Sequence, residues 1–408
     1  MYISLFTPCH STIYLRDLYD SIKDQNFNEW VIILNGEATK EEIDWATKFE
    51  YDRRIKVFKY EGQSNFIGAL KKFATSKCTM ELLVELDCDD LLEPNAIGEI
   101  KKAFEDKEVG FVYSNHADFK GNFEKGARYD SAFGWGNRWR DFEYNGKILD
   151  ECRAFEPTPQ SVSRIWYAPN HVRAWRKDVY DKIGGHDETM RVLDDQDIMA
   201  RTYLATKMKH IDKCLYLYRI HGKNTWIERN QEIQNNVMRL YDKYIFDLML
   251  RWCDLEGLRK LDLGGQFNHD KRLENIDLSE GIDLNKTWPM KDNSVGLIRA
   301  NDLFEHLADK LHTIKEAYRV LAQGGMIIGQ TPNALSQGFA QDPTHCSAYV
   351  ENSFRYYTEK RFAQYIGTPV RFQAIRLETT PLNNDGCSWI IHHLVALKGQ
   401  ECPGMILI

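Results

Sequence analysis

The part of the sequence that most clearly suggests chemistry is a group of aspartates that follows an apolar run. The stretch "LLVELDCDDLLEP" (residues 82–94) places Asp87, Asp89 and Asp90 directly after an apolar segment. Carboxylates this close repel one another, and burying them is costly without a cation. A D-x-D pair offers hard oxygen ligands for Mg²⁺ or Mn²⁺, ions that also bind phosphate oxygens. A solvated turn is the alternative, and the motif alone leaves both interpretations open.

The aspartates follow one of several short apolar segments that alternate with amphipathic stretches. The spacing predicts strands and helices in this order: Tyr2–Thr7, helix Leu15–Asp24, Trp30–Leu34, Ile55–Lys59, helix Ile67–Ser76 and strand Glu81–Leu86. Such alternation indicates an α/β fold with a parallel, doubly wound sheet. Ligands bind such sheets outside the carboxyl ends of the strands, where Asp87–Asp90 lies. This position favours a functional site over a solvated turn.

Further along the chain the pattern changes and then begins again. Residues Ser114–Arg164 show no clear period and predict a long loop region or small subdomain over the site, whereas Gln231–Cys253 predicts a long bridging helix. A second α/β unit is predicted from strands at Leu258–Leu263, Leu297–Ala300 and Met326–Thr331 and a helix at Lys310–Leu321. The predicted domains are 1–228 and 255–408, joined by a helical linker at 229–254.

Composition narrows the class of protein. The 408 residues are 43% hydrophobic and 28% charged, which fits two soluble domains. A net charge of -7 argues against broad nucleic-acid binding, and no apolar run is long enough to predict a transmembrane segment. The 9 cysteines include no CxxC pair, and the amino terminus enters a strand without a basic leader. Both features predict a cytoplasmic protein with reduced thiols.

Over roughly residues 1–225 the chain resembles family 2 glycosyltransferases, which have the GT-A fold. The resemblance rests on five segments in the family's order: "SLFTPCHSTIYLRDLYDSIKDQ", "NEWVIILNGE", "NFIGALKKFATSKCTMELLVELDCDDLLEPNAI", "VRAWRKDVYDKIGGHDETMRVLDDQDIMAR" and "YLYRIHGKNT". It implies a nucleotide-diphospho-sugar donor, a saccharide acceptor, transfer with inversion, and Mn²⁺ or Mg²⁺ as cofactor.

The resemblance also implies metal-binding roles for individual residues. Asp87 is similar to the residue that contacts the ribose or the metal, and Asp89 to the metal ligand proper. Asp90 fits the following turn or a helix cap, for which aspartate is favoured. His221 in "YRIHGKNT" is similar to a third metal contact, although a lone histidine is often a structural, hydrogen-bonded residue.

A second group of residues is expected beside the nucleotide. The resemblance places Thr7, Pro8, His10, Asn35 and Asn65 in the donor-binding region. The chain departs from the family at Asn35, where an aspartate is usual. Asparagine can still hydrogen-bond a base or ribose but carries no charge, which leaves the identity of the nucleotide open.

The segment "LDDQD" is similar to the part of the family that carries the catalytic base. Asp195 corresponds to that general base, and Asp194 lies beside it. An inverting transfer needs a carboxylate that accepts the proton of the acceptor hydroxyl, and repulsion between neighbouring acids raises one pKa. An acidic helix N-terminus, stabilised by the helix dipole, is the structural alternative, and both roles are compatible.

Aromatic residues gather near the predicted loop region. The run Phe133–Trp139, together with Trp166, offers flat apolar faces on which sugar rings can stack. Packing in the core of a small subdomain is the alternative.

The second predicted unit resembles the short S-adenosylmethionine-dependent methyltransferases associated with surface polysaccharide synthesis. The resemblance covers roughly residues 255–375 and rests on "LRKLDLGGQFNHDKRLENIDLSEGIDL", "TWPMKDNSVGLIRANDLFEHL", "EAYRVLAQGGMIIGQTPN" and "QDPTHCSAYVENSFRYYTEKRF". It implies cofactor binding by five residues: Gly264, Gly265, Asp277, Asp283 and Asn301. It also implies that His345 in "DPTH" could act as a base for a sugar hydroxyl. Glu305 and His306 could face the acceptor or serve the structure.

One departure affects this second unit. About ten residues separate Gly265 from the next strand, too few for loops and a normal helix. Three hypotheses follow: a glycosyltransferase that also O-methylates a sugar, an O-methyltransferase whose first domain only binds glycan or nucleotide, and a glycosyltransferase with a degenerate methyltransferase-like scaffold. A non-enzymatic binding protein is the remaining alternative.

Overall fold

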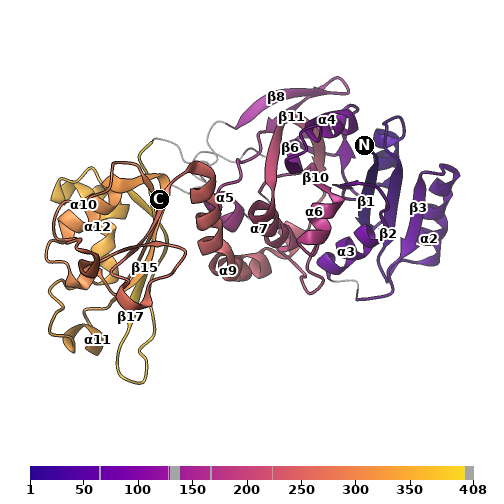
Figure 1. Cartoon of the computed structure of the whole chain (residues 1–408). Coiled ribbons are helices and arrows are strands. Elements are labelled where there is room, and N and C mark those ends of the chain that lie inside the picture. The colour runs from indigo at the N-terminus through magenta and orange to yellow at the C-terminus, as the bar shows by residue number, and fades with distance from the viewer. Residues whose placement is uncertain (64–65, 127, 129–137, 166–167, 223, 400–408) are drawn as a thin grey trace. The chain divides into compact units, whose positions relative to one another are not determined.

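The computed structural model describes residues 1–63, 66–126, 128, 138–165, 168–222 and 224–399. The chain divides into two compact units, Met1–Ile245 and Phe246–Ile408 (Figure 1). The division falls inside the long helix α9 (Asn230–Glu256), so the helix predicted over Gln231–Cys253 is present. Among the described residues, no helix combines the length and apolar character needed to cross a lipid bilayer.

The first unit starts with a parallel sheet of the predicted kind. Strands β1 (Ile3–Cys9), β2 (Glu29–Leu34), β3 (Ile55–Lys59) and β4 (Leu82–Glu85) pair in the order β3-β2-β1-β4. The connecting helices include α1 (Leu15–Ile22), α2 (Lys40–Ala46) and α3 (Ile67–Lys77). All pairs among these strands are parallel, so their carboxyl ends, including the one before Asp87, share one edge.

Beyond β4, past the strands for which a parallel arrangement was predicted, the sheet becomes mixed. Strand β10 (Arg173–Arg176) lies antiparallel between β4 and β6 (Val109–Lys120). Strand β11 (Lys207–Arg219) runs parallel to β6, and β5 (Leu91–Leu92) pairs antiparallel with β11. The order of pairing is set by strands far apart in the chain, which local periodicity does not reveal.

The segment Ser114–Arg164, expected to be a loop region or small subdomain, contains regular structure. Strand β6 extends to Lys120, and β8 (Trp139–Tyr144) forms a hairpin with β9 (Lys147–Cys152), which also pairs with β6. The strand pattern in β8 was hidden because charged and aromatic residues alternate there. The other elements of this unit are β7 (Glu124–Lys125), α4 (Ala96–Ala103), α5 (Pro159–Arg164), α6 (Lys177–Lys182), α7 (Asp194–Ala205) and α8 (Thr225–Glu228).

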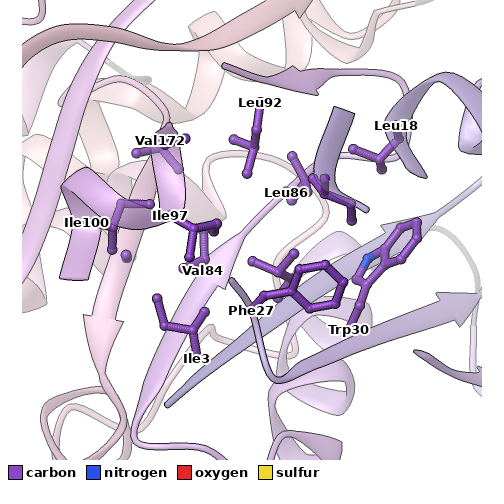
Figure 2. Close-up of a cluster of buried hydrophobic side chains, with 14 of the residues drawn as sticks. Ile3, Leu18, Phe27, Trp30, Val84, Leu86, Leu92, Ile97, Ile100 and Val172 are labelled. Carbon is purple, nitrogen blue, oxygen red and sulfur yellow. The ribbon is translucent and has the colours of Figure 1, made fainter. Parts of the chain in front are cut away.

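An apolar core holds the parallel strands against their helices. Figure 2 shows Ile3 and Val84 from β1 and β4 facing Ile97 and Ile100 from α4. Trp30 is fully buried as well, and its indole nitrogen donates a hydrogen bond to the hydroxyl oxygen of Thr7 (2.8 Å). Burial of such side chains stabilises the sheet by roughly 1.5–3 kcal/mol each. The core therefore gives a rigid base to the strand ends.

The second unit has a sheet in the order β13-β12-β14-β15-β17-β16. Its strands are β12 (Arg259–Leu263), β13 (Glu274–Ile276), β14 (Val295–Asn301), β15 (Leu321–Pro332), β16 (Phe372–Thr379) and β17 (Trp389–Ala396). Its helices are α10 (Lys310–Val320), α11 (Gln337–Ala340), α12 (Arg355–Thr358) and α13 (Lys360–Ala363). The first four strands in this order pair in parallel and β17 is antiparallel. The predicted strands and helix are present.

The connection between β12 and β13 is as short as the sequence indicated. It holds a single 3₁₀ turn, Gln266–Asn268, and is too short for a longer helix. The carboxyl ends of β12 and β13 are joined directly, because the backbone nitrogen of Gly264 donates to the carbonyl of Ile276 (2.9 Å). Turns, rather than a helix, therefore connect β12 to β13.

Candidate functional site

A cavity of about 430 Å³ opens at the carboxyl ends of β1 and β4 in the first unit. It is lined by six of the residues predicted for the site: Pro8, His10, Asp87, Asp89, Asp194 and Asp195. The two acidic segments lie more than a hundred residues apart in the chain and face the same space. A cavity of this size suits a small polar ligand.

Asp89 lines the cavity and pairs with His221, which is not itself among the lining residues. Oδ2 of Asp89 lies 2.8 Å from Nε2 of His221, and Arg219 holds the two segments together by donating from Nε to the Asp89 carbonyl (2.7 Å). A carboxylate oxygen and an imidazole nitrogen at this separation fit one divalent cation. Asp87 lines the same cavity, with Oδ2 3.9 Å from Nε2 of His171.

Asp90 serves the structure. Its side chain is buried, and its two carboxylate oxygens accept from the Arg219 backbone nitrogen (2.7 Å) and the Tyr216 hydroxyl (2.8 Å). These bonds attach β11 to the turn after β4. The aspartate turn is therefore anchored by its third member, while the first two face the cavity.

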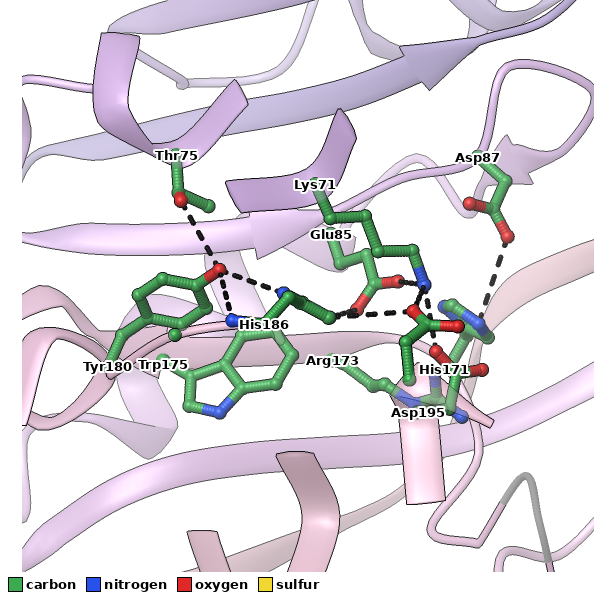
Figure 3. Close-up of polar contacts among 12 residues, drawn as sticks. Lys71, Thr75, Glu85, Asp87, His171, Arg173, Trp175, Tyr180, His186 and Asp195 are labelled. Carbon is green, nitrogen blue, oxygen red and sulfur yellow. Dashed lines mark hydrogen bonds and ion pairs between the residues drawn. The ribbon is translucent and has the colours of Figure 1, made fainter. Parts of the chain in front are cut away.

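A buried charge network supports the second acidic segment (Figure 3). Nζ of Lys71 lies 2.7 Å from Oε1 of Glu85 and 2.8 Å from both Asp194 Oδ2 and Asp195 Oδ1. The guanidinium of Arg173 lies 2.8 Å from Oδ2 of Asp195. Two cations therefore meet three carboxylates, and Asp195 is bound by both.

The network shifts the pKa values of the two neighbouring aspartates in opposite directions. Burial opposes ionisation of Asp195, but Arg173 and Lys71 outweigh it and hold the pKa of that carboxyl well below its usual range. Burial raises the pKa of Asp194 to about 7 despite the opposing charge of Lys71. The expected rise of one pKa thus falls on Asp194, with burial as the main cause and like-charge repulsion from Asp195 as a smaller one.

Three local features bring this network together. In the sheet register Arg173 lies opposite Glu85. Gly68 allows the segment between α6 and α7 to approach α3, since a Cβ at Gly68 would lie 2.0 Å from the Asp187 carbonyl oxygen. Lys71 is one turn further along the same helix face. Leu193, with φ of 63°, turns the chain into α7 directly before Asp194.

Only some of the residues predicted beside the nucleotide line the cavity. Pro8 and His10 line the cavity. Thr7 is fully buried and its hydroxyl accepts from Trp30, so it belongs to the core of the sheet. Asn35 begins the turn after β2, where its Oδ1 accepts from the Glu37 backbone nitrogen (3.1 Å), and it is not among the cavity-lining residues. Asn65 lies outside the described residues.

His10 and Cys88 form an unusual pair at the cavity wall. Nδ1 of His10 lies 3.5 Å from Sγ of Cys88. This contact is the main cause that raises the pKa of His10 to about 9. A hydrogen bond from Cys9 and the contact with His10 outweigh burial and lower the pKa of Cys88 to about 5.

Several cavity residues were not predicted. Lys71, His171, Arg173, Arg191 and Arg229 all line the cavity. Lys71, Arg173 and Arg191 lie in segments that carry the family resemblance, but no local pattern marks them as site residues; "ALKKF", for example, does not distinguish Lys71 from the exposed Lys72. Of the aromatic residues proposed for stacking, Trp139 lines the cavity, whereas 133–137 and 166 lie outside the described residues.

In the second unit the predicted cofactor residues gather along one sheet edge. Gly264 and Gly265 follow β12, Asp277 follows β13, and Asn301 ends β14. Gly264 has φ of 69°, and a Cβ there would lie 2.8 Å from the Leu303 side chain.

Three of the polar residues predicted for this unit have contacts within the protein. Asp277 is buried and accepts from the backbone nitrogen of Ser279 (2.8 Å). Asp283 accepts from the backbone nitrogen of Asn285 (3.0 Å) and lies 3.3 Å from Nζ of Lys286, so its carboxylate is already engaged in a surface turn. His345 is buried beside Glu305, with 3.8 Å between Nε2 and Oε1.

Comparison with protein families agrees with this architecture. Residues 4–166 match the model for glycosyl transferase family 2, and residues 266–329 match a methyltransferase domain model. The first unit contains a family 2 glycosyltransferase domain. The second unit contains a methyltransferase domain, so the chain joins two domains of different families.

Two curated relatives match just over half of the chain. The chain is 23% identical over 230 residues to a hyaluronan synthase of Pasteurella multocida, which is 56% of this chain and 21% of that protein. It is 23% identical over 229 residues to a chondroitin synthase of Pasteurella multocida (strain Pm70), at 55% and 21%. The chain thus spans about a fifth of the length of these relatives.

Solved structures resemble the chain more weakly. S. aureus TarS 1–349 matches 66% of this chain and 76% of its own, with 14% identity and a TM-score of 0.44. The mannosyltransferase PcManGT from Pyrobaculum calidifontis, in complex with GDP-Man and Mn²⁺, matches 62% of this chain and 64% of its own, with 11% identity and a TM-score of 0.38.

Proposed function

We propose that the glycosyltransferase unit transfers a sugar from a nucleotide-diphospho-sugar to a saccharide hydroxyl in polysaccharide synthesis, with inversion at the anomeric carbon. The bond from that carbon to the acceptor oxygen forms while its bond to the diphosphate oxygen breaks. The acceptor proton passes to a carboxylate, and the nucleoside diphosphate leaves. The observation that carries the proposal is the single cavity lined by Asp87, Asp89 and the ionised Asp195.

Asp195 is the proposed general base. Each of its oxygens contacts one buried cation, Lys71 or Arg173, and a carboxylate oxygen retains a second lone pair after such a contact. The two cations therefore fix the orientation of the carboxylate and keep it ionised at neutral pH. Its side chain is 22% exposed, which leaves it accessible to an acceptor hydroxyl in the cavity.

The proposed metal site consists of Asp89, His221 and Asp87. The residues fit Mn²⁺ or Mg²⁺, because the donor atoms of Asp89 and His221 already lie side by side and Asp87 lines the same cavity. A bound divalent ion would neutralise charge on the departing diphosphate. His10, whose pKa is raised by Cys88 and the nearby carboxylates, supplies a further positive charge at the cavity wall.

The experiment is a measurement of nucleoside diphosphate release from a panel of nucleotide sugars, with and without Mn²⁺. We expect metal-dependent release by the full chain and its loss in Asp89→Ala. Asp44→Ala, an exposed carboxylate on α2, is the matched control and should retain full activity. Release that does not require metal, or that persists in Asp89→Ala, would contradict the proposed site.

We also propose that the second unit binds S-adenosylmethionine and O-methylates a sugar. The methyltransferase match and the position of Gly264, Gly265 and Asp277 at one sheet edge support this. The tight turn and the buried carboxylate fit a ribose-bearing cofactor at that edge. When bound, the cofactor would supply the methyl group. Tethering would present the glycosylated product to the second site at high effective concentration.

Cofactor titration separates this proposal from the alternatives. Binding of S-adenosylmethionine that is lost in Asp277→Ala, together with methyl transfer to a saccharide, supports a bifunctional enzyme. Methyl transfer without nucleotide-sugar turnover supports a methyltransferase whose first domain only binds its glycan. Sugar transfer without cofactor binding supports a degenerate second domain that serves as a scaffold.

A further inference from the structure

Three side chains of the second unit converge at the carboxyl end of β14. Glu305 and His306 belong to the 3₁₀ turn Phe304–His306, and His345 comes from the segment after α11. Each offers one potential ligand atom, and these atoms lie within 4.8 Å of one another. Glu305 is fully buried and the His345 side chain is 6% exposed, so the group is not a loose surface cluster.

Among the described residues, only one of the two carboxylate oxygens of Glu305 has a hydrogen-bond donor. Its Oε2 accepts a hydrogen bond from the Thr331 hydroxyl (2.7 Å). Its Oε1 has no hydrogen-bond partner among the described residues. A buried carboxylate oxygen without a donor carries a desolvation cost that a nearby cation would remove.

The ring of His345 presents a lone pair to that oxygen. Its Nδ1 lies 2.8 Å from the Phe339 carbonyl oxygen, and a carbonyl can only accept, so Nδ1 carries the proton. In the neutral ring Nε2 is therefore an acceptor, and it lies 3.8 Å from Oε1 of Glu305. This is too long for a direct hydrogen bond. Two ligand atoms that each lie about 2.1 Å from one ion can be this far apart.

His306 is oriented in the same way by its own partner. Its Nδ1 lies 3.0 Å from the Thr344 hydroxyl oxygen, and that hydroxyl lies 2.6 Å from Oδ1 of Asp342. The hydroxyl has one proton and the carboxylate accepts it, so Nδ1 of His306 is the donor to Thr344. The lone pair of His306 is then on Nε2. Histidine ligands of metals commonly donate from the other ring nitrogen in this manner.

Backbone bonds hold the two segments in place. The backbone nitrogens of Cys346 and Ser347 both donate to the carbonyl of Glu305, at 2.8 and 2.9 Å. Oδ2 of Asp342 also lies 3.8 Å from Nε2 of His345. The three side chains are therefore arranged before any ligand arrives, with a further carboxylate nearby.

We propose that Glu305, His306 and His345 bind a divalent first-row transition metal ion such as Zn²⁺, with Asp342 within reach as a fourth ligand. Two imidazoles and a carboxylate favour such an ion over Mg²⁺, which prefers oxygen ligands. Three protein ligands leave positions for water or for an oxygen of a bound saccharide. The site is distinct from Asp89 and His221 and does not depend on the sugar-transfer proposal.

The experiment uses the full chain carrying Asp89→Asn, which weakens the cation site of the first unit. The protein is stripped with a chelator and titrated with Co²⁺, whose visible absorption reports nitrogen coordination, and then with Zn²⁺ in competition. We expect one equivalent of Co²⁺ to bind, Zn²⁺ to displace it, and millimolar Mg²⁺ not to compete. His345→Asn should weaken binding at least tenfold, because asparagine can keep the bond to Phe339 but removes the Nε2 ligand.

A matched control tests adventitious binding. His312→Ala removes a partly exposed histidine whose Nε2 contacts the Lys286 carbonyl (2.9 Å), and it should leave Co²⁺ affinity unchanged. Melting curves without metal should coincide for the parent and His345→Asn. Absence of a Co²⁺ spectrum in the parent would overturn the proposal, as would equal affinity in His345→Asn.

Discussion

The two units place acidic side chains at the same kind of sheet edge but balance their charge differently. In the first unit, Lys71 and Arg173 contact Asp195 directly inside the protein. In the second, Glu305 faces the lone-pair nitrogen of His345, and within the described chain its Oε1 is given no hydrogen bond. The first arrangement orients a carboxylate with the protein's own cations, whereas the second leaves room for an external one.

The two groups of charges also differ in whether the protein balances them without a ligand. A carboxylate held by two buried cations is preorganised for proton transfer at neutral pH. A carboxylate opposed by imidazole nitrogens becomes fully satisfied only when a proton or metal ion arrives. The predictions below test how strongly each unit depends on its buried charges.

The largest effect is expected from Asp195→Asn. Removing the proposed base should lower kcat for sugar transfer by roughly 10²–10⁴-fold with little change in KM for the donor. The measurement is steady-state kinetics with saturating acceptor. Asp181→Asn, an exposed carboxylate on α6, is the control. Unchanged kcat in Asp195→Asn would remove this residue from the proton-transfer role and weaken the contrast between the units.

Lys71→Ala should destabilise the first unit by about 3–5 kcal/mol, because it leaves the buried carboxylates without their shared cation. The side chain is 5% exposed, so solvent cannot replace it. The neighbouring Lys72→Ala removes a half-exposed lysine paired with Glu188 at 3.4 Å and should cost less than about 1 kcal/mol. Urea unfolding followed by hydrogen exchange in unit-specific peptides measures both. Similar losses in the free energy of unfolding for the two variants would show that the buried network stabilises the first unit no more than a surface ion pair does.

The second unit should lose stability in acid through His392. The ring is fully buried between Phe304 and Phe354, and burial lowers its pKa to about 3. Since the folded-state value lies below the unfolded value of about 6.5, the contribution is present above pH 6.5 and is lost as pH falls toward 3. His392→Leu should reduce this loss by a few kcal/mol.

The measurement for His392→Leu is hydrogen exchange of the second unit between pH 6.5 and 4, with the first unit as an internal reference. Some acid sensitivity should remain, because burial also lowers the pKa of His393 to about 4. A parent and variant with parallel pH profiles would contradict the assignment to His392.

The smallest effect is expected at the surface of the second unit. Arg259 on β12 pairs with Glu274 on β13 at 2.5 Å, with exposed fractions of 37% and 50%. Arg259→Ala should change the free energy of unfolding by less than about 1 kcal/mol, because water screens and replaces such a pair. A loss in the free energy of unfolding near that of Lys71→Ala would mean that this exposed ion pair stabilises its unit as much as the buried network does.

The sequence by itself was enough to predict several of the strands and helices. Residues Ile55–Lys59, Ile67–Ser76 and Lys310–Leu321 form the expected elements because their apolar periodicity is strong and local. The aspartates after β4 were also predictable, since a sharp change from apolar to acidic residues marks a strand end. The pairing of Asp89 with His221 was expected only through the family resemblance.

Other parts of the site were decided by tertiary structure alone. Nothing local in "ALKKF" or "HVRAWR" indicates that Lys71 and Arg173 meet at Asp195, because a buried ion pair depends on strand order and on the close approach at Gly68. The same applies to Thr7, whose hydroxyl is used by Trp30 in the core. Periodicity determines which residues form a strand, but only the packing of distant segments determines which charges share a low-dielectric space and how their pKa values separate.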